Sequence, residues 1–268
     1  KKVKGKMKTA LTIAGSDSSG GAGIQADIKA MSANGVFAMS VITAITAQNT
    51  MGVFGIEDIS PEMIKSQIKA IFDDIKVDAI KIGMVSKIES IKAISEGLRE
   101  IKDLPPIVLD PVMVSTSGYK LLSDDAKETL IKELFPLATL ITPNLPEVEE
   151  ILGIKVEDME EMKEAAKELK KLGAKYVLIK GGHLKNDATD LLFDGENFIY
   201  FKEQKINTNN THGTGCTLSS AIAANLAKGM KIEDAVREGK EYITLAIKHS
   251  FKLGHGSGPT NHFYELYK

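Results

Sequence analysis

The stretch Ala10-Leu-Thr-Ile-Ala-Gly-Ser-Asp-Ser-Ser-Gly-Gly-Ala-Gly23 passes from a short apolar run into a glycine-rich loop. Residues 11–14 predict a buried first strand, and the loop leads into a helix that contains Gln25 and Asp27. Ligands of open parallel sheets bind at the carboxyl ends of the strands, which is where this loop must lie. The loop is long for a plain connection between a strand and a helix, which favours a binding role over an ordinary turn.

Short apolar runs alternate with longer segments of helical period along the rest of the chain. This pattern is typical of parallel strands joined by crossover helices, so we predict an α/β fold. Two further apolar segments, 188–193 and 198–201, flank a turn and predict an antiparallel hairpin at the sheet edge. The predicted strands of the central sheet are 11–14, 36–45, 79–82, 107–109, 139–141 and 176–179.

Helix boundaries carry readable signals. Ser60 is a candidate N-cap before Pro61 and Glu62, and residues 123–125 repeat that pattern. A helix over 158–172 has its apolar residues on one face and ends at Gly173. Two final helices are predicted over 216–228 and 232–251.

The amino-acid composition limits which classes of protein this chain can belong to. The chain has 268 residues, with 43% hydrophobic and 26% charged residues, as in ordinary globular proteins. The formal net charge of -2 provides no overall positive field, so we expect no nucleic-acid or membrane partner. No segment approaches the roughly 18 apolar residues of a membrane span, and we expect a cytoplasmic protein. Residues 1–6 are predicted to be an N-terminal extension before Met7, and residues 7–268 a single domain.

The single cysteine lies in the most conspicuous glycine motif, His-Gly-Thr-Gly-Cys-Thr over residues 212–217. It precedes a helix of small residues, whose unpaired N–H groups and positive dipole end attract anions. Cys216 would lie in the first turn, where the pKa of a thiol tends to fall and a thiolate can act as a base. An ordinary glycine turn with a buried cysteine is the alternative.

Polar residues follow several predicted strands. Gln48 and its neighbours could read the edge of a heterocycle, or form a plain polar turn. Asn144 and Glu147 have the spacing of a capping box, yet they could also organise a hydrated magnesium ion beside a phosphate. Asp110 and Lys180 add a charge of each sign at strand ends, and a lysine is a natural partner of phosphate.

Taken together, these motifs resemble the ribokinase-like small-molecule kinases, and among them the hydroxymethylpyrimidine and hydroxymethylpyrimidine phosphate kinases of thiamine biosynthesis. The resemblance implies a three-layer sandwich with a mostly parallel sheet, ATP and Mg2+ as cofactors, a homodimer, and no fused second enzyme. It covers nearly the whole chain, in the order 10–17, 20–27, 48–50, 81–84, 109–113, 142–147, 180–183, 211–216 and 254–259.

The resemblance also implies roles for individual residues. Cys216 stands where other ribokinase-like enzymes have an aspartate base, and Lys180 with the backbone of 213–215 would meet phosphate charge. Gln48 would hold the aminopyrimidine. The resemblance assigns the rest of the pyrimidine pocket to Gly15, Asp27, Met84 and Val112, and it assigns catalytic roles to Gly213 and Gly215. The implied nucleotide contacts are Lys180, Asn144 and Thr214. Magnesium would be bound, through water molecules, by Glu147, Asn144 and Asp110.

Two other functions stay open at this level. The vitamin B6 branch of the same family phosphorylates pyridoxal or pyridoxine, and some of its members share the cysteine. A non-catalytic nucleotide or pyrimidine sensor on the same fold is the other alternative. The complete set of phosphate-binding residues and the cysteine favours an enzyme over a sensor, because a sensor needs no base.

Overall fold

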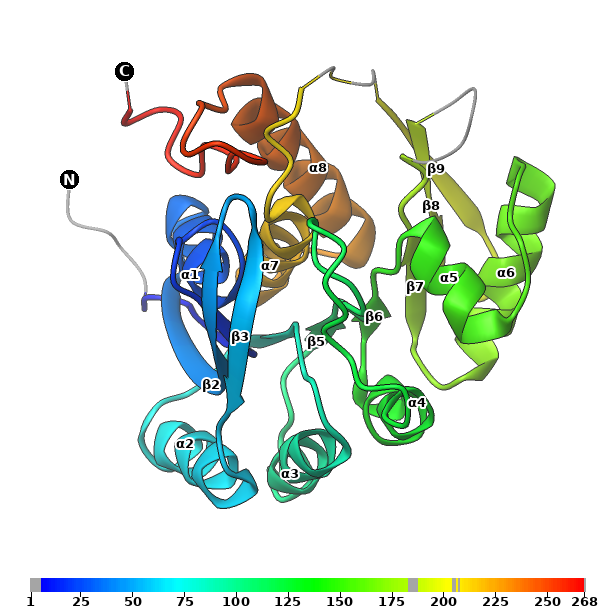
Figure 1. Ribbon diagram of the computed structural model, residues 1–268. Helices are drawn as coiled ribbons and strands as arrows, with labels where there is room; N and C mark the ends of the chain where they lie inside the picture. Colours follow the sequence, from blue (N-terminus) through cyan, green and yellow to red (C-terminus); the bar gives the residue numbers. More distant parts are fainter. Residues whose placement is uncertain (1–5, 183–187, 204–205, 207, 268) are drawn as a thin grey trace.

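The strands form one sheet that runs through the whole molecule. The structure, a computed structural model, describes residues 6–182, 188–203, 206 and 208–267. Within them the sheet has nine strands in the order β3-β2-β1-β4-β5-β6-β7-β8-β9 (Figure 1). The strands are β1 (Thr9–Asp17), β2 (Phe37–Asn49), β3 (Gly52–Asp58), β4 (Ala79–Ile82), β5 (Ile107–Leu109), β6 (Leu140–Ile141), β7 (Tyr176–Ile179), β8 (Ala188–Phe193) and β9 (Phe198–Glu203).

Strand direction changes only towards the two edges. The run from β2 through β1, β4, β5 and β6 to β7 is parallel, whereas β3, β8 and β9 pair antiparallel with their neighbours. The carboxyl ends of the parallel strands therefore meet at one edge of the sheet, where the loop after β1, Asp110 and Lys180 all lie.

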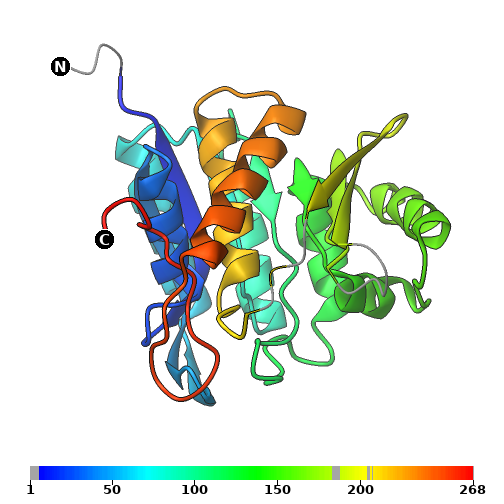
Figure 2. The same ribbon diagram turned by 90° about the horizontal axis from the view of Figure 1, so that it is seen from above.

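Helices cover both faces of the sheet (Figures 1 and 2). On one face α7 packs against both α1 and α8, and on the other α3 packs against α2 and α4, with α5 against α6. Each layer buries its own apolar cluster against the sheet. The helices are α1 (Gly23–Ala33), α2 (Pro61–Asp74), α3 (Ile88–Arg99), α4 (Lys127–Leu134), α5 (Leu145–Leu152), α6 (Met159–Lys171), α7 (Thr214–Ala227) and α8 (Ile232–Lys248), with a short 3-10 helix, η1 (Phe135–Leu137), after α4.

The predicted α/β class is confirmed, and so are the six central strands and the hairpin of β8 and β9. The capping prediction for Ser60 is also confirmed, because its side chain accepts the N–H of Met63. The structure adds a cap at Asp158, which accepts the N–H of Glu161 at the start of the predicted helix over 158–172. The prediction for residues 123–125 is wrong, because Ser123 donates to the Asp125 carboxylate and α4 begins only at Lys127.

Strand β3 was not predicted. It is an edge strand whose residues are mostly half-buried, with Val53 buried and Phe54 and Glu57 exposed, so it lacks the continuous buried run of the central strands. As a result, Gln48 lies at the end of a long β-hairpin rather than in a loop after a strand.

The two ends of the chain differ in how they relate to the rest of the fold. Residues 1–5 of the predicted N-terminal extension lie outside the described residues. In the described part of the chain, no helix has the length and apolar character needed to cross a membrane. Beyond α8, the C-terminal segment returns to the tip of the β2–β3 hairpin, where Ser257 donates its N–H to the carbonyl of Thr50 at 3.0 Å (Figure 2).

Candidate active site

The two glycine loops singled out in the sequence touch each other. Gly213 is the N-cap of α7 and has a φ of 78°, a conformation that favours glycine. A Cβ at this position would overlap the carbonyl oxygen of Gly21 in the loop after β1. The start of α7 is thus fixed against that loop, with the amides of its first turn left without acceptors inside the helix.

An ion pair lies beside this helix start. The Nζ of Lys180 is 3.2 Å from Oδ1 of Asp110, and Thr142 donates its hydroxyl to the same oxygen. A Cβ on Gly215 would lie 3.3 Å from Nζ of Lys180 and 3.4 Å from Oδ2 of Asp110. Residues from β5, β7 and α7, far apart in the sequence, therefore meet at one point.

Asn144 and Glu147 form the capping box that their spacing predicts. The side chain of each accepts the backbone N–H of the other, both at 2.9 Å. Burial raises the pKa of Glu147 to about 7; Lys180 opposes this shift and the negative Asp110 adds to it. Asp110 and Glu147 thus repel each other while Lys180 attracts both, and a cation placed near the two carboxylates would stabilise their charged forms.

A metal ion could not be held here by the protein alone. In the described ranges, no group of three or more His, Cys, Asp or Glu side chains is arranged to hold one. Magnesium, however, is usually bound by one or two carboxylates together with water and substrate phosphate. Asp110 and Glu147 fit that kind of site.

Cys216 is partly exposed in the first turn of α7, as predicted. The expectation of a lowered pKa is wrong: burial raises the pKa of the thiol to about 11, although Lys81 and the N–H of Gly23 act in the opposite direction. The helix start alone therefore does not produce a thiolate. Burial of the sulfur has a larger effect on the pKa of the thiol than the helix start has.

Three of the predicted pyrimidine-pocket residues come together. A Cβ on Gly15 would lie 3.0 Å from Sδ of Met84. Met84 belongs to a small apolar cluster with Ala44 and Leu121, against which Val112 packs. This cluster offers an apolar surface of the kind that a flat heterocycle can pack against.

Asp27 lies deeper than the sequence suggests. It is fully buried, and Lys81 donates to both of its oxygens at 2.9 Å. Thr12 and Ser220 donate their hydroxyls to the same carboxylate, at 2.6 and 2.7 Å. Both oxygens thus have protein partners, and direct contact between Asp27 and a pyrimidine stays a prediction.

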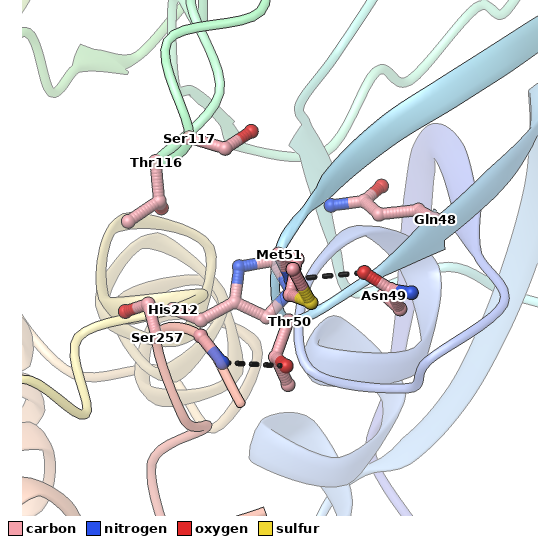
Figure 3. Close-up of a pocket in the computed structure, with 9 residues that line it drawn as sticks. Gln48, Asn49, Thr50, Met51, Thr116, Ser117, His212 and Ser257 are labelled. Atoms are coloured by element: carbon pink, nitrogen blue, oxygen red, sulfur yellow. Dashed lines mark hydrogen bonds between the residues drawn. The ribbon is translucent and has the colours of Figure 1, made fainter. Parts of the chain in front are cut away.

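A cavity of about 210 Å³ opens beside the helix start (Figure 3). Gln48 and His212 line it from different elements, and the Gln48 amide oxygen accepts the hydroxyl of Thr46 at 3.0 Å. The residues of the hairpin tip and the C-terminal segment belong to stretches singled out in the sequence, whereas Thr116 and Ser117 were not identified, because they reach the cavity from a loop distant in sequence. The lining is Gln48, Asn49, Thr50, Met51, Thr116, Ser117, His212, Gly256 and Ser257.

The loop after β1 is organised by a buried carboxylate that sequence reasoning missed. Asp17 accepts the N–H groups of Ser19, Gly21 and Ala22, and its Oδ2 is 2.9 Å from Nε2 of His212. Burial works against the charged form of Asp17, but the bonds from His212 and Ser19 outweigh it and lower the pKa to about 2. Asp17 thereby ties the first glycine loop to the residue before Gly213.

Asp17→Asn is expected to destabilise the fold by about 2 to 4 kcal/mol at pH 7, because buried donors lose their charged acceptor. The folded-state pKa lies below the ordinary value of 3.8, so this contribution is complete above pH 3.8 and disappears as the pH falls towards 2. Urea unfolding of both proteins between pH 7 and pH 3 measures it. The exposed Asp73→Asn is the control, and an equal difference at every pH would contradict the prediction.

Comparison with known proteins places the chain in a family. Residues 17–261 match the family described as phosphomethylpyrimidine kinase. The chain belongs to this family. It is 52% identical over 263 residues to the hydroxymethylpyrimidine/phosphomethylpyrimidine kinase of Rhizobium meliloti, covering 97% of this chain and 98% of the relative. The corresponding protein of Bacillus subtilis is 44% identical over 256 residues, which cover 95% of this chain and 94% of the relative.

Solved structures of the phosphomethylpyrimidine kinase family and its neighbours share the fold. The phosphomethylpyrimidine kinase of Clostridium difficile is 54% identical, with a TM-score of 0.81 over 90% of this chain and all of that one. An ADP complex of Bacillus subtilis pyridoxal kinase is 42% identical, with a TM-score of 0.89 over 98% of this chain and all of that one. The predicted ribokinase-like fold and the enzyme class are confirmed.

Proposed function

We propose that this protein transfers the γ-phosphoryl group of ATP to 4-amino-5-hydroxymethyl-2-methylpyrimidine, and then a second one to the monophosphate so formed. Membership of the phosphomethylpyrimidine kinase family supports the reaction, and relatives crystallised with ADP or an ATP analogue support the nucleotide. The observation that carries the proposal is the meeting of Lys180, Asp110 and Gly215 at the start of α7, next to Cys216.

Phosphoryl transfer needs positioning and charge neutralisation more than covalent chemistry. In this proposal the amides of Gly213 and Gly215 and the Lys180 ammonium bind the phosphoryl oxygens. Thr214, whose N–H and hydroxyl both donate to the carbonyl of Thr211, lies at the same turn. Fixed donors of this kind stabilise the charge that develops in the transition state without reorganising. The rigid contact between Gly213 and the loop of Gly21 supports that role.

The acceptor hydroxymethyl group has to lose a proton. Its oxygen forms a bond to the γ-phosphorus, the bond from that phosphorus to the bridging oxygen of ATP breaks, and ADP leaves with the electron pair. The hydroxyl proton passes to the Cys216 thiolate. Since burial raises the pKa of this thiol, nearby positive charge is needed for the thiolate to form.

Asp110 and Glu147 would hold magnesium, in part through water. Asn144 fixes the position of Glu147 by the capping box that the two residues form. When bound, magnesium supplies positive charge that neutralises the phosphates. Lys180 keeps Asp110 in place by their ion pair.

The substrate would lie between the apolar cluster and the cavity. Met84 and Val112 offer it an apolar surface and Gly15 allows close approach, while Gln48 supplies the amide for the aminopyrimidine edge. Asp27 is fully buried, and its contact with the pyrimidine is a prediction of the family resemblance. A homodimer remains a prediction of the family resemblance, and a cytoplasmic location remains a prediction from the sequence.

Pyridoxal kinase activity is the second candidate, because pyridoxal kinases of Bacillus subtilis and Staphylococcus aureus share this fold at 42% and 34% identity. An ADP-release assay with the pyrimidine, its monophosphate, pyridoxal and ribose separates the possibilities. We expect turnover of the first two, with kcat/KM at least about tenfold above that for pyridoxal. Faster turnover of pyridoxal would assign the protein to the other branch, and no turnover at all would indicate a sensor.

A further inference from the structure

A fully buried lysine next to the candidate base has no role in the mechanism so far. Lys81 lies in β4, surrounded by core residues, with none of its side chain exposed. Burying a lysine is costly unless it is paired, and here both oxygens of Asp27 accept from its ammonium at 2.9 Å. Burial works against the charged form of Lys81, but Asp27, Cys216 and Asp110 raise its pKa above the ordinary value. The lysine is therefore a permanent cation in the core.

The ion pair lies where two helices face each other. Cys216 and Ser220 are four residues apart in α7, and Gly23 and Asp27 are four apart in α1, so each pair lies on one helix face. The hydroxyl of Ser220 donates to Asp27 at 2.7 Å, and just before these helices an added Cβ at Gly213 would overlap the carbonyl oxygen of Gly21. One face of α1 thus meets one face of α7, and Lys81 reaches the Asp27 carboxylate from the sheet.

The charges that act on the Cys216 sulfur come from three elements. Lys81 in β4 favours the thiolate, whereas Asp27 in α1 and Asp110 after β5 disfavour it. Lys180, paired with Asp110, lies beside the preceding residue Gly215. Helix α7 itself carries no charged side chain. Lys81 is thus the cation that favours the thiolate of Cys216, and Asp27 fixes the position of its ammonium.

We propose that Lys81 is a positioning residue for phosphoryl transfer: its ammonium, anchored by Asp27, stabilises the Cys216 thiolate that takes up the substrate proton. This inference rests on the proposed function for its catalytic meaning. The electrostatic link between Lys81 and Cys216 is a separate property of the fold and can be measured without substrate.

Cys216 is the chain's single cysteine, so alkylation of the protein reports on this thiol alone. Rates with iodoacetamide are measured by mass spectrometry between pH 7 and pH 10, and Cys216→Ser gives the background. Because the thiolate is the reacting form, Lys81→Met should slow alkylation about tenfold or more at each pH. Asp27→Asn should accelerate it at least about threefold, since the lysine then acts without its opposing carboxylate.

The two variants are expected to change the alkylation rate in opposite directions, which distinguishes an electrostatic effect from damage to the packing of the core. Loosening the core would change access to the sulfur in the same direction in both variants. Lys240→Met is the matched control, because it removes the ammonium of another buried pair, 2.6 Å from Asp190, and neither residue is among the three charges named above for Cys216. It should leave the alkylation rate within about twofold of the wild type.

An unchanged rate in Lys81→Met, or shifts of the same sign in both variants, would overturn the proposal. If Lys81→Met does not fold, Asp27→Asn decides alone, and a rate equal to or below that of the wild type overturns it. In the kinase assay Lys81→Met should lower kcat at least about tenfold, with KM values for ATP and pyrimidine within about threefold. An unchanged kcat with the alkylation shift intact would refute the catalytic part. A wild-type protein without kinase activity would instead refute the proposed function and leave the link between Lys81 and Cys216 standing.

Discussion

Replacing Cys216 with alanine is expected to lower kcat for the pyrimidine by about 10²- to 10⁴-fold, the range that general bases contribute. The KM for the pyrimidine should stay within about threefold, because the thiol accepts a proton and does not hold the ring. Steady-state ADP release measures both quantities. Near-normal turnover with intact substrate affinity would show that Cys216 is not the base.

The pH dependence gives a second readout for the same residue. The pKa of the thiol lies above the neutral range, so the fraction of thiolate grows as the pH rises from 7 to 9. The kcat of the wild type should rise over this range, and the rise should disappear in Cys216→Ala. Ser219→Ala is the control, because it also removes one heavy atom from the start of α7, where the Ser219 hydroxyl donates to the carbonyl of Gly215. Its kcat should stay within about threefold of the wild type.

Gly213→Ala is expected to lower kcat by about 100-fold or more. The φ of 78° disfavours any residue with a side chain, and the added methyl group would overlap the carbonyl oxygen of Gly21. The start of α7 has to move, and its amides then leave the positions from which they would bind phosphate. Loss of one fixed donor to a developing anion already costs about 10²- to 10³-fold in comparable enzymes.

The matched control for this variant is Gly229→Ala. Gly229 follows the other end of α7 with a φ of 89°, and an added Cβ there meets no atom within 4 Å. We expect a stability loss of about 1 to 2 kcal/mol from the backbone conformation and an unchanged kcat. Circular dichroism and thermal unfolding check that both variants are folded. Equal kinetic effects at the two glycines would mean that backbone strain, and not the contact with Gly21, determines the activity.

Structural features that depend on residues close together in the sequence could be predicted. The period of apolar residues identified the central strands and the helix at 159–171, because local periodicity decides which face is buried. The capping box of Asn144 and Glu147 and the cap at Ser60 follow from side chains three residues from their partners. Strand β3 escaped prediction, since a half-buried edge strand need not be apolar.

The site needed more than local pattern. The glycine loops, Lys180, Asp110 and Cys216 were identified as separate motifs, and only their order along the chain pointed to a single family. The structure brings Gly21 against Gly213 and Lys180 against Asp110, contacts between residues that are distant in sequence. Asp17 was not predicted as a functional residue, because no neighbouring residue in the sequence indicates its hydrogen bond to His212, which lies 195 positions later.

The fold class, the family and the residue types available for phosphate, pyrimidine and proton transfer could be inferred from the amino-acid sequence, because short-range patterns and motif order are enough for these. The charges that surround each group became known from the folded structure alone. Cys216 looked like an activated thiol at a helix start, yet burial raises its pKa, and Lys81 from the middle of the sheet opposes that effect. Electrostatic energies depend on distance and burial in space, and neither can be read from positions along the chain.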